Sequence, residues 1–148
     1  MLSRAEATDR ILAAKESRGL SFRAIAEHVG RDPVWTTSAL LGQQVMDAAE
    51  ADAVVELLGL DREVAIALQR HPSKGSLSPT VPTDPLIYRF YEIVQVYGTT
   101  LKALIEEEFG AGIMSAIDFE MHVERMPDPK GDRVRVTMHG KFLPYRKW

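Results

Sequence analysis

The sequence predicts an α+β chain, with a helical bundle first and a domain of helices and one β-hairpin last. Two changes of pattern indicate this order. Serine or aspartate caps and glycine stops recur at helical spacing in the first half, whereas residues 71–85 hold four of the eight prolines and show no helical period. After residue 116, apolar and charged residues alternate with a period of two, which is typical of strands.

Five short helices are predicted in the first half from the residues that favour helix ends. Each has a serine or aspartate that can accept the first backbone N–H bonds, and a glycine or proline follows the last turn. We expect helices over about residues 4–18, 21–30, 32–42, 47–59 and 61–72. Their core is predicted to consist of Leu12, Ile25, Val29, Leu40, Leu41, Val54, Leu57, Leu58 and Leu68.

The second half is predicted to contain two helices and a hairpin. The helices cover residues 86–97 and about 100–109, with a break at Tyr97-Gly98, and a glycine loop over residues 110–115 follows. Two alternating strands then flank a turn at residues 127–132, with acids facing outward on the first strand and arginines on the second. The chain is thus divided into a helical bundle (1–76), a linker (77–85) and a C-terminal catalytic and dimerisation domain (86–148).

We expect this C-terminal domain to be too small to bury its own apolar residues and so to be unstable alone. A lone hairpin is marginal in water, and the helix at residues 86–97 is apolar on every side. We therefore expect an obligate oligomer in which other subunits bury this half. The closing segment FLPYRKW, with Tyr145 and Trp148, is either an ordered tail or an interface anchor.

Composition narrows the classes of function. The 148-residue chain has a formal net charge of −3, so it has no general attraction to nucleic acid or to an anionic membrane. It contains no cysteine, which excludes disulfides, thiolate catalysis and cysteine-ligated zinc. Apolar runs are short and the N-terminus carries acids, so we expect neither a membrane span nor a signal peptide. A cytoplasmic protein is predicted.

Arg89 and Glu92 are the only charged residues between Leu86 and Thr100, in the segment LIYRFYEIVQVYGTT. In a helix, residues three apart lie side by side on one face. Because the segment is otherwise apolar, we expect it to be buried, and a buried charge requires a partner. Two interpretations remain open: a structural ion pair that fixes an interface, or a site in which Arg89 binds a small anion while Glu92 orients the guanidinium.

Ser115 follows the glycine loop and is a second candidate site residue. Backbone N–H groups of such a loop can form a concavity that binds an anion beside the hydroxyl. The simpler interpretation is that the serine bonds to the backbone, as serines in turns commonly do. No metal site is expected, because no two of the four histidines, His28, His71, His122 and His139, are four residues apart as metal ligands on one helix would be.

The stretch SFRAIAEHVGRDPVWTTSALLG has the pattern of a helix-turn-helix, whose second helix would enter a DNA major groove. The charges oppose this function. Residues 33–43 contain no lysine or arginine, and residues 1–60 hold six lysines and arginines against nine acids. Phosphate contacts supply most of the affinity for DNA, so a packing unit is favoured. A DNA-binding regulator with a C-terminal oligomerisation domain is the alternative function, and a non-catalytic oligomeric scaffold is a third.

The segment PLIYRFYEIVQVYGTTLKALIEEEFGAGIMSAIDF, with the later DPKGDRV and GKFLPYRKW, resembles the C-terminal domain of the cyanase family, the cyanate hydratases or cyanate lyases. The stretch GLSFRAIAEHVGRDPVWTTSALLGQ resembles the N-terminal helical domain of that family. The resemblance covers nearly the whole chain. The catalytic arginine and glutamate of the family match Arg89 and Glu92 in YRFYE, and its catalytic serine matches Ser115 in GIMSAI.

The resemblance implies a detoxifying lyase reaction in which cyanate and bicarbonate give carbon dioxide and carbamate, and carbamate decomposes to ammonia and a second carbon dioxide. It implies a homodecamer, a ring of five dimers with interlocked C-terminal domains and active sites shared between subunits. It also implies that no metal or organic cofactor is needed, and that the helical bundle serves assembly. The expected partners are then cyanate and bicarbonate, without nucleic acid or membrane.

Overall fold

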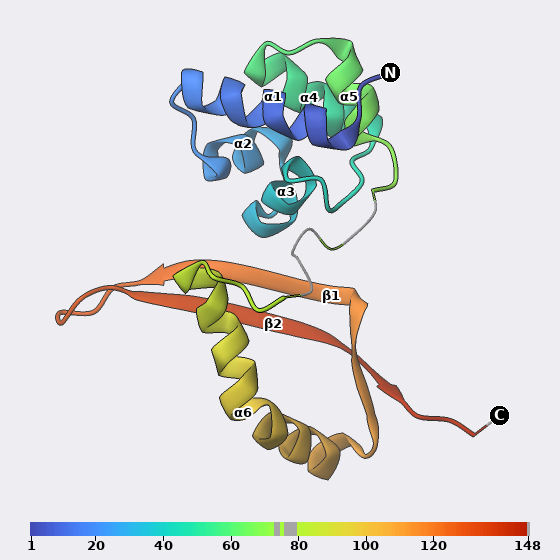
Figure 1. Ribbon diagram of the computed structural model, residues 1–148, viewed down its shortest axis with the longest axis vertical. Helices are drawn as coiled ribbons and strands as arrows, with labels where there is room; N and C mark the ends of the chain where they lie inside the picture. Colours follow the sequence, from blue (N-terminus) through green and yellow to red (C-terminus); the bar gives the residue numbers. More distant parts are fainter. Residues whose placement is uncertain (73–74, 76–79, 148) are drawn as a thin grey trace. The chain divides into compact units, whose positions relative to one another are not determined.

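The computed structural model describes residues 1–72, 75 and 80–147, and over these it shows six helices followed by a two-stranded hairpin (Figure 1). Residues 77–79 of the predicted linker and Trp148 lie outside the described residues. The α+β class is confirmed. In the part of the chain that is described, no helix combines the length and the apolar character needed to cross a bilayer. The elements are α1 (Arg4–Ser17), α2 (Phe22–Val29), α3 (Pro33–Leu40), α4 (Ala48–Leu58), α5 (Arg62–Leu68), α6 (Pro85–Phe109), β1 (Gly112–Met126) and β2 (Arg133–Pro144).

The chain forms two compact units, and the hairpin contributes to both. Residues 1–75 with 121–137 make the first unit, and residues 76–120 with 138–148 make the second. Within the first unit, an Arg23 guanidinium N–H donates to the Val123 carbonyl at 2.6 Å, so α2 is tied to the outer part of β1. The boundaries expected from the sequence, 1–76, 77–85 and 86–148, remain a prediction.

The helices of the bundle begin where their capping residues predict. Ser3 with Glu6 and Asp47 with Glu50 each form a complete capping box, in which both residues bond to the other's backbone N–H. Asp61 precedes α5 but makes no side-chain cap hydrogen bond. Capping is therefore a reliable signal for the start of a helix here, even where one cap bond is absent.

The core lies among α1 to α5, with two corrections to the predicted set. Ile11 is fully buried, whereas Leu12 is only partly buried, because the inward face of α1 is the row that contains Ala7 and Ile11, four residues apart. Leu41 is 44% exposed, because α3 ends at Leu40 and the next residue already turns away from the core. Val29 and Leu57 are partly buried and pack against the core.

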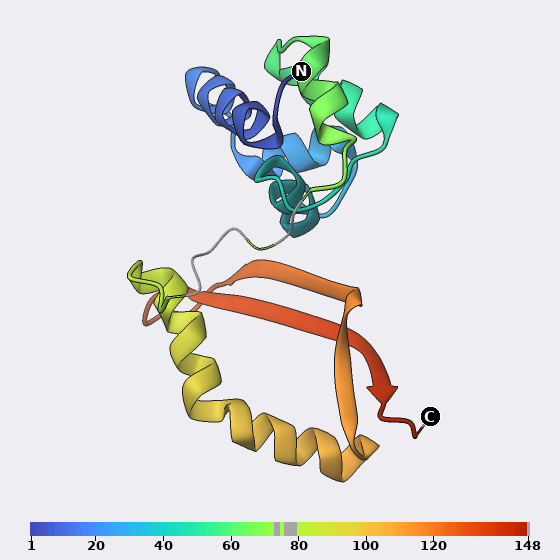
Figure 2. The same cartoon turned by 45° about the vertical axis from the view of Figure 1, so that its right-hand side comes forward.

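The predicted break at Tyr97-Gly98 is wrong, because α6 is one helix of 25 residues. A glycine inside a helix costs only about 1 kcal/mol relative to alanine, so it weakens a helix without ending it. The helix instead changes direction partway along its length, as both views show (Figures 1 and 2). It begins at Pro85, one residue before the predicted start, where Asp84 accepts hydrogen bonds from the next free backbone amides.

The hairpin forms as predicted, with a longer first strand. β1 starts at Gly112, so Ser115 belongs to a strand and not to the predicted glycine loop. Across the strands, Glu124 and Arg135 form the complementary pair that the charge pattern predicts, at 3.7 Å. Four residues back along β1, Glu120 pairs with His139 on β2 at 3.6 Å. The two pairs are four residues apart on each strand, so they share one register in the outer part of the hairpin.

Candidate active site

Arg89 and Glu92 lie side by side on α6, as their spacing predicts. The Arg89 Nε is 3.0 Å from the Glu92 carboxylate. Their side chains are 69% and 46% exposed, although the sequence predicted burial, and no residue of α6 is buried within the single chain. The physical reason is that one chain supplies only a two-stranded hairpin beside a helix that is apolar on most faces.

Such exposure limits what this ion pair can do for stability. Pairs of solvent-exposed charges contribute between zero and about 1 kcal/mol to the free energy of unfolding, so this pair stabilises the single chain only weakly. A guanidinium carries five N–H donors in a planar fork, and the contact with Glu92 involves one edge of it. The remaining donors of Arg89 can therefore meet a planar or carboxylate-like anion.

Ser115 is the buried member of the predicted set, with an exposed fraction of 7%. Its Oγ accepts hydrogen bonds from the Ile117 and Asp118 backbone amides at 3.1 and 2.9 Å. The simpler interpretation, a bond to the backbone, is thus confirmed, and these two amides are occupied by the hydroxyl. A hydroxyl can accept two hydrogen bonds and donate one, so the Ser115 proton remains available to an anion.

Ser115 lies where β1 contains more residues than β2. From Gly112 to Glu120 there are eight steps along β1, whereas the residues beside them, Leu143 and His139, are only four steps apart. The extra residues form a bulge, which bends a strand. In both views β1 turns a corner partway along its length (Figures 1 and 2). The bulge explains why the Ile117 and Asp118 amides bond to a side chain.

Gly140 on β2 lies directly against this bulge, and it was not among the predicted site residues. A Cβ atom at Gly140 would be closer than 3.0 Å to the Ser115 carbonyl oxygen and 3.2 Å from that of Asp118. The sequence signal that could have identified Gly140 is its place inside a strand of alternating residues, since glycines there mark bulges or close approach of another backbone.

The structure joins two of the three predicted site residues. Among the described residues, Ser115 makes no hydrogen bond with Arg89 or Glu92. A hollow of about 370 Å³ lies between the second half of α6, the start of β1 and Tyr145, and none of the three predicted residues lines it. Both elements of the site nevertheless belong to the same compact unit.

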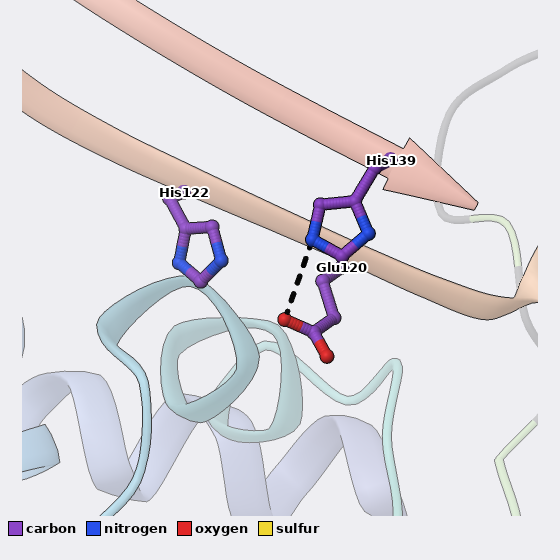
Figure 3. A group of neighbouring side chains, drawn as sticks. All are labelled: Glu120, His122 and His139. Carbon is purple, nitrogen blue, oxygen red and sulfur yellow. Dashed lines mark ion pairs between the residues drawn. The ribbon is translucent and has the colours of Figure 1, made fainter.

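The hairpin also brings histidine and carboxylate side chains together, and each has a protein partner. Glu120 pairs with His139 across the strands, as the dashed line in Figure 3 shows. His122 is two residues along β1 from Glu120, and its Nδ1 is 2.9 Å from the Asp32 carboxylate. Imidazole and carboxylate are ligands that Zn²⁺ accepts, but each of these groups already contacts a protein partner. The expected absence of a metal site stays a prediction.

The carboxyl of Asp32, in the first unit, has a pKa that is set by its local contacts. Partial burial alone would raise the pKa of its carboxyl. Hydrogen bonds from His122 and from the Val34 and Trp35 amides outweigh burial and hold the pKa of Asp32 below its ordinary value. The residue is therefore firmly ionised while it caps α3.

Comparison with known proteins identifies the class first. A family model described as "Cyanate hydratase, N-terminal" matches residues 4–72, and one described as "Cyanate lyase C-terminal domain" matches residues 79–147. The two together account for nearly all of the chain. This combination defines a lyase with an N-terminal helical domain.

Full-length relatives agree with both matches. A protein named cyanate hydratase from Cupriavidus necator is 58% identical, over 99% of this chain and 100% of the relative. One of the same name from Acaryochloris marina is 56% identical, over 97% and 98%. A crystal structure of cyanase from T. urticae superposes with a TM-score of 0.82 at 41% identity, covering 93% of this chain and 96% of that one. This chain belongs to the cyanate hydratase (cyanate lyase) family. The DNA-binding alternative is not favoured by these relatives.

Proposed function

We propose that this chain catalyses the bicarbonate-dependent decomposition of cyanate, in which cyanate, bicarbonate and one proton give carbamate and carbon dioxide, with Arg89, Glu92 and Ser115 as its catalytic residues. The observation that carries the proposal is the identity of 58% over the full length of a relative named cyanate hydratase. No covalent enzyme intermediate is required, because the two reactants can combine directly once they are held together. No metal or organic cofactor is assigned, and bicarbonate is a co-substrate.

The chemistry requires that two anions meet. Their repulsion would be severe in a site of low dielectric constant without positive charge to compensate it. The Arg89 guanidinium supplies that charge, and Glu92, 3.0 Å away, holds its orientation while leaving other N–H donors for the reactants. Binding both anions in one pocket replaces a bimolecular encounter with an oriented one.

The Ser115 hydroxyl supplies a directed donor. Because the Ser115 Oγ accepts hydrogen bonds from the Ile117 and Asp118 amides, its hydroxyl proton points away from both amides. A donor fixed in this way can stabilise negative charge as it develops on a carboxylate-like intermediate without reorganising during the reaction.

We further propose that the active site is completed by other copies of the chain, in a homodecamer built as a ring of five dimers. Twelve large apolar side chains of α6 are more than a third exposed in the single chain, among them Val94, Leu104 and Phe109. Contiguous apolar surface of this extent marks an interaction site. A second copy that covers α6 would also bury the Arg89–Glu92 pair and exclude water from it.

The catalytic proposal is tested by ammonia release from cyanate with and without bicarbonate. We expect release only when both are present, and oxalate, a small planar dianion, should inhibit competitively. Arg89→Ala should lower kcat/KM by at least about 100-fold, the range typical for loss of one electrostatic contact to a transition state. Full activity of the Arg89→Ala variant would show that the site is elsewhere.

A second ion pair on the same helix provides a matched control. Lys102 and Glu106 pair one turn apart on α6, with side-chain exposures of 67% and 38%, close to those of Arg89 and Glu92. Lys102→Ala therefore removes a comparable contact without touching the proposed site. Its loss in kcat/KM should be much smaller than that of Arg89→Ala, because an assembly that covers α6 would shield both pairs alike and only Arg89 meets the reactants. Equal losses in both variants would mean that the effect is structural.

The assembly is tested by light scattering coupled to size-exclusion chromatography. Ten chains of 16.5 kDa give about 165 kDa. Leu104→Lys places a charge on the exposed apolar face of α6 and should shift the protein to smaller species with loss of activity, because a charge buried at an interface is costly. A wild-type protein that remains monomeric at the assay concentration would contradict the proposal.

A cytoplasmic location is also proposed, in keeping with a chain that has no cysteine for disulfides.

A further inference from the structure

Two glycines of the hairpin are required by space and not by backbone conformation. At Gly140 a Cβ atom would approach the Ser115 carbonyl oxygen to less than 3.0 Å and the Met114 Cγ to 2.8 Å. At Gly112 it would come within 3.0 Å of the Leu143 oxygen and of the Pro144 Cα. Neither has a positive φ, unlike the glycines at the helix ends and turns. A side chain at either position would therefore be excluded only by the strand opposite.

The two glycines differ in what they approach. Gly112 lies at the start of β1, against the end of β2. Gly140 lies against the bulge itself, where the Ser115 and Asp118 carbonyl oxygens are both among its nearest atoms. The amides of the same bulge are the ones that bond to the Ser115 Oγ. The backbone of β2 at Gly140 therefore supports the turn that aims the hydroxyl.

We propose that Gly140 is a positioning residue for the reaction: because it has no side chain, β2 can press against the Ser115–Asp118 bulge and fix the direction of the Ser115 hydroxyl. This inference rests on the proposed role of Ser115. A methyl group at residue 140 would push the Ser115 and Asp118 carbonyls away from β2. The bulge would then rotate, and the hydroxyl would remain present but misdirected. A displacement of about 1 Å in a catalytic group can cost on the order of 100-fold in rate.

The test compares Gly140→Ala with Gly112→Ala, which introduces a collision of the same severity outside the bulge. We expect Gly140→Ala to lower kcat at least about 10-fold with little change in the KM for cyanate, because the anions still meet Arg89. Gly112→Ala should stay within about threefold of wild type. In a Ser115→Ala background, adding Gly140→Ala should cause no further loss, since residues that act through one another are non-additive.

Three outcomes would overturn the inference: wild-type kcat in Gly140→Ala, equal losses in the two glycine variants, or additive losses in the double variant. Amide hydrogen exchange gives a readout that does not depend on turnover. The Ile117 and Asp118 amides should be protected in the wild-type protein and lose protection in Ser115→Ala and Gly140→Ala, but not in Gly112→Ala. If Gly140→Ala fails to assemble, absence of protection in the wild-type protein still refutes a rigid bulge. A wild-type protein that does not turn over cyanate would refute the proposed function instead.

Discussion

Arg4 offers the sharpest test of what stabilises the helical bundle. Its guanidinium donates hydrogen bonds to three carbonyl oxygens: Ala67 in α5 at 3.0 Å, Ala39 in α3 at 3.1 Å and Gln44 at 2.7 Å. The Ala67 and Ala39 carbonyls lie in the last turns of α5 and α3, where each also accepts a hydrogen bond from a backbone amide beyond the helix, and Gln44 lies in the segment after α3. One side chain of α1 thus links the C-terminal turns of two other helices.

Arg4→Met keeps most of the aliphatic stem and removes every donor. At about 1.5 kcal/mol for each bond from a charged donor, three bonds represent about 4–5 kcal/mol. Two costs already present in the native state offset part of this: the Nε is buried without a partner, and burial, followed by the nearby charge of Arg70, lowers the pKa of Arg4. We therefore expect a net destabilisation of about 2–3 kcal/mol, because desolvating a charge consumes part of the gain.

Urea unfolding followed by far-UV circular dichroism, at one fixed protein concentration, measures this change. Arg10→Met is the matched control, because Arg10 lies on the same helix and its ion pair with the exposed Asp61 is long, at 3.9 Å. It should cost less than about 0.5 kcal/mol. If the two variants unfold at the same urea concentration, the three carbonyl contacts contribute nothing and the reasoning is refuted.

Three further predictions concern single side chains. Asp47→Ala should lower the free energy of unfolding by about 1 kcal/mol in a urea titration, and Asp61→Ala should lower it much less. The reason is that Asp47 makes a cap hydrogen bond and Asp61 does not. Equal losses in the two variants would contradict this. The pKa of Asp32 is lower in the folded chain than in the unfolded chain, so between the two pKa values only the unfolded chain binds the proton. The contribution of Asp32 to stability is therefore present above about pH 4 and is lost as the pH falls through the folded pKa. Asp32→Asn should flatten the dependence of the free energy of unfolding on pH between about 2.5 and about 6, and an unchanged slope would refute this. Ser115→Ala should lower kcat about 100- to 1,000-fold, because the directed hydroxyl donor is removed. It should also lower the free energy of unfolding by about 1–2 kcal/mol, since two backbone amides lose their acceptor. A folded variant with wild-type kcat would exclude Ser115 from the site.

Local sequence signals account for most of the secondary structure. The caps at Ser3 and Asp47 depend on residues three apart, and the alternation in the hairpin depends on neighbours, so both can be recognised without any tertiary contact. The same logic correctly placed Arg89 beside Glu92. It failed at Gly98, where a local preference against helix is smaller than the cooperative gain from continuing the helix through it.

By itself, the sequence determined the α+β class, the five helices of the bundle, the paired charges on α6 and the resemblance that led to the proposed chemistry. Only the tertiary structure decided how Ser115 is held, because its bulge is set by Gly140, which is 25 residues away on another strand. It also decided that Arg4 links α3 and α5. Both depend on contacts between residues far apart in the chain, and a pattern of neighbouring residues carries no information about which distant backbone group will come within hydrogen-bonding distance.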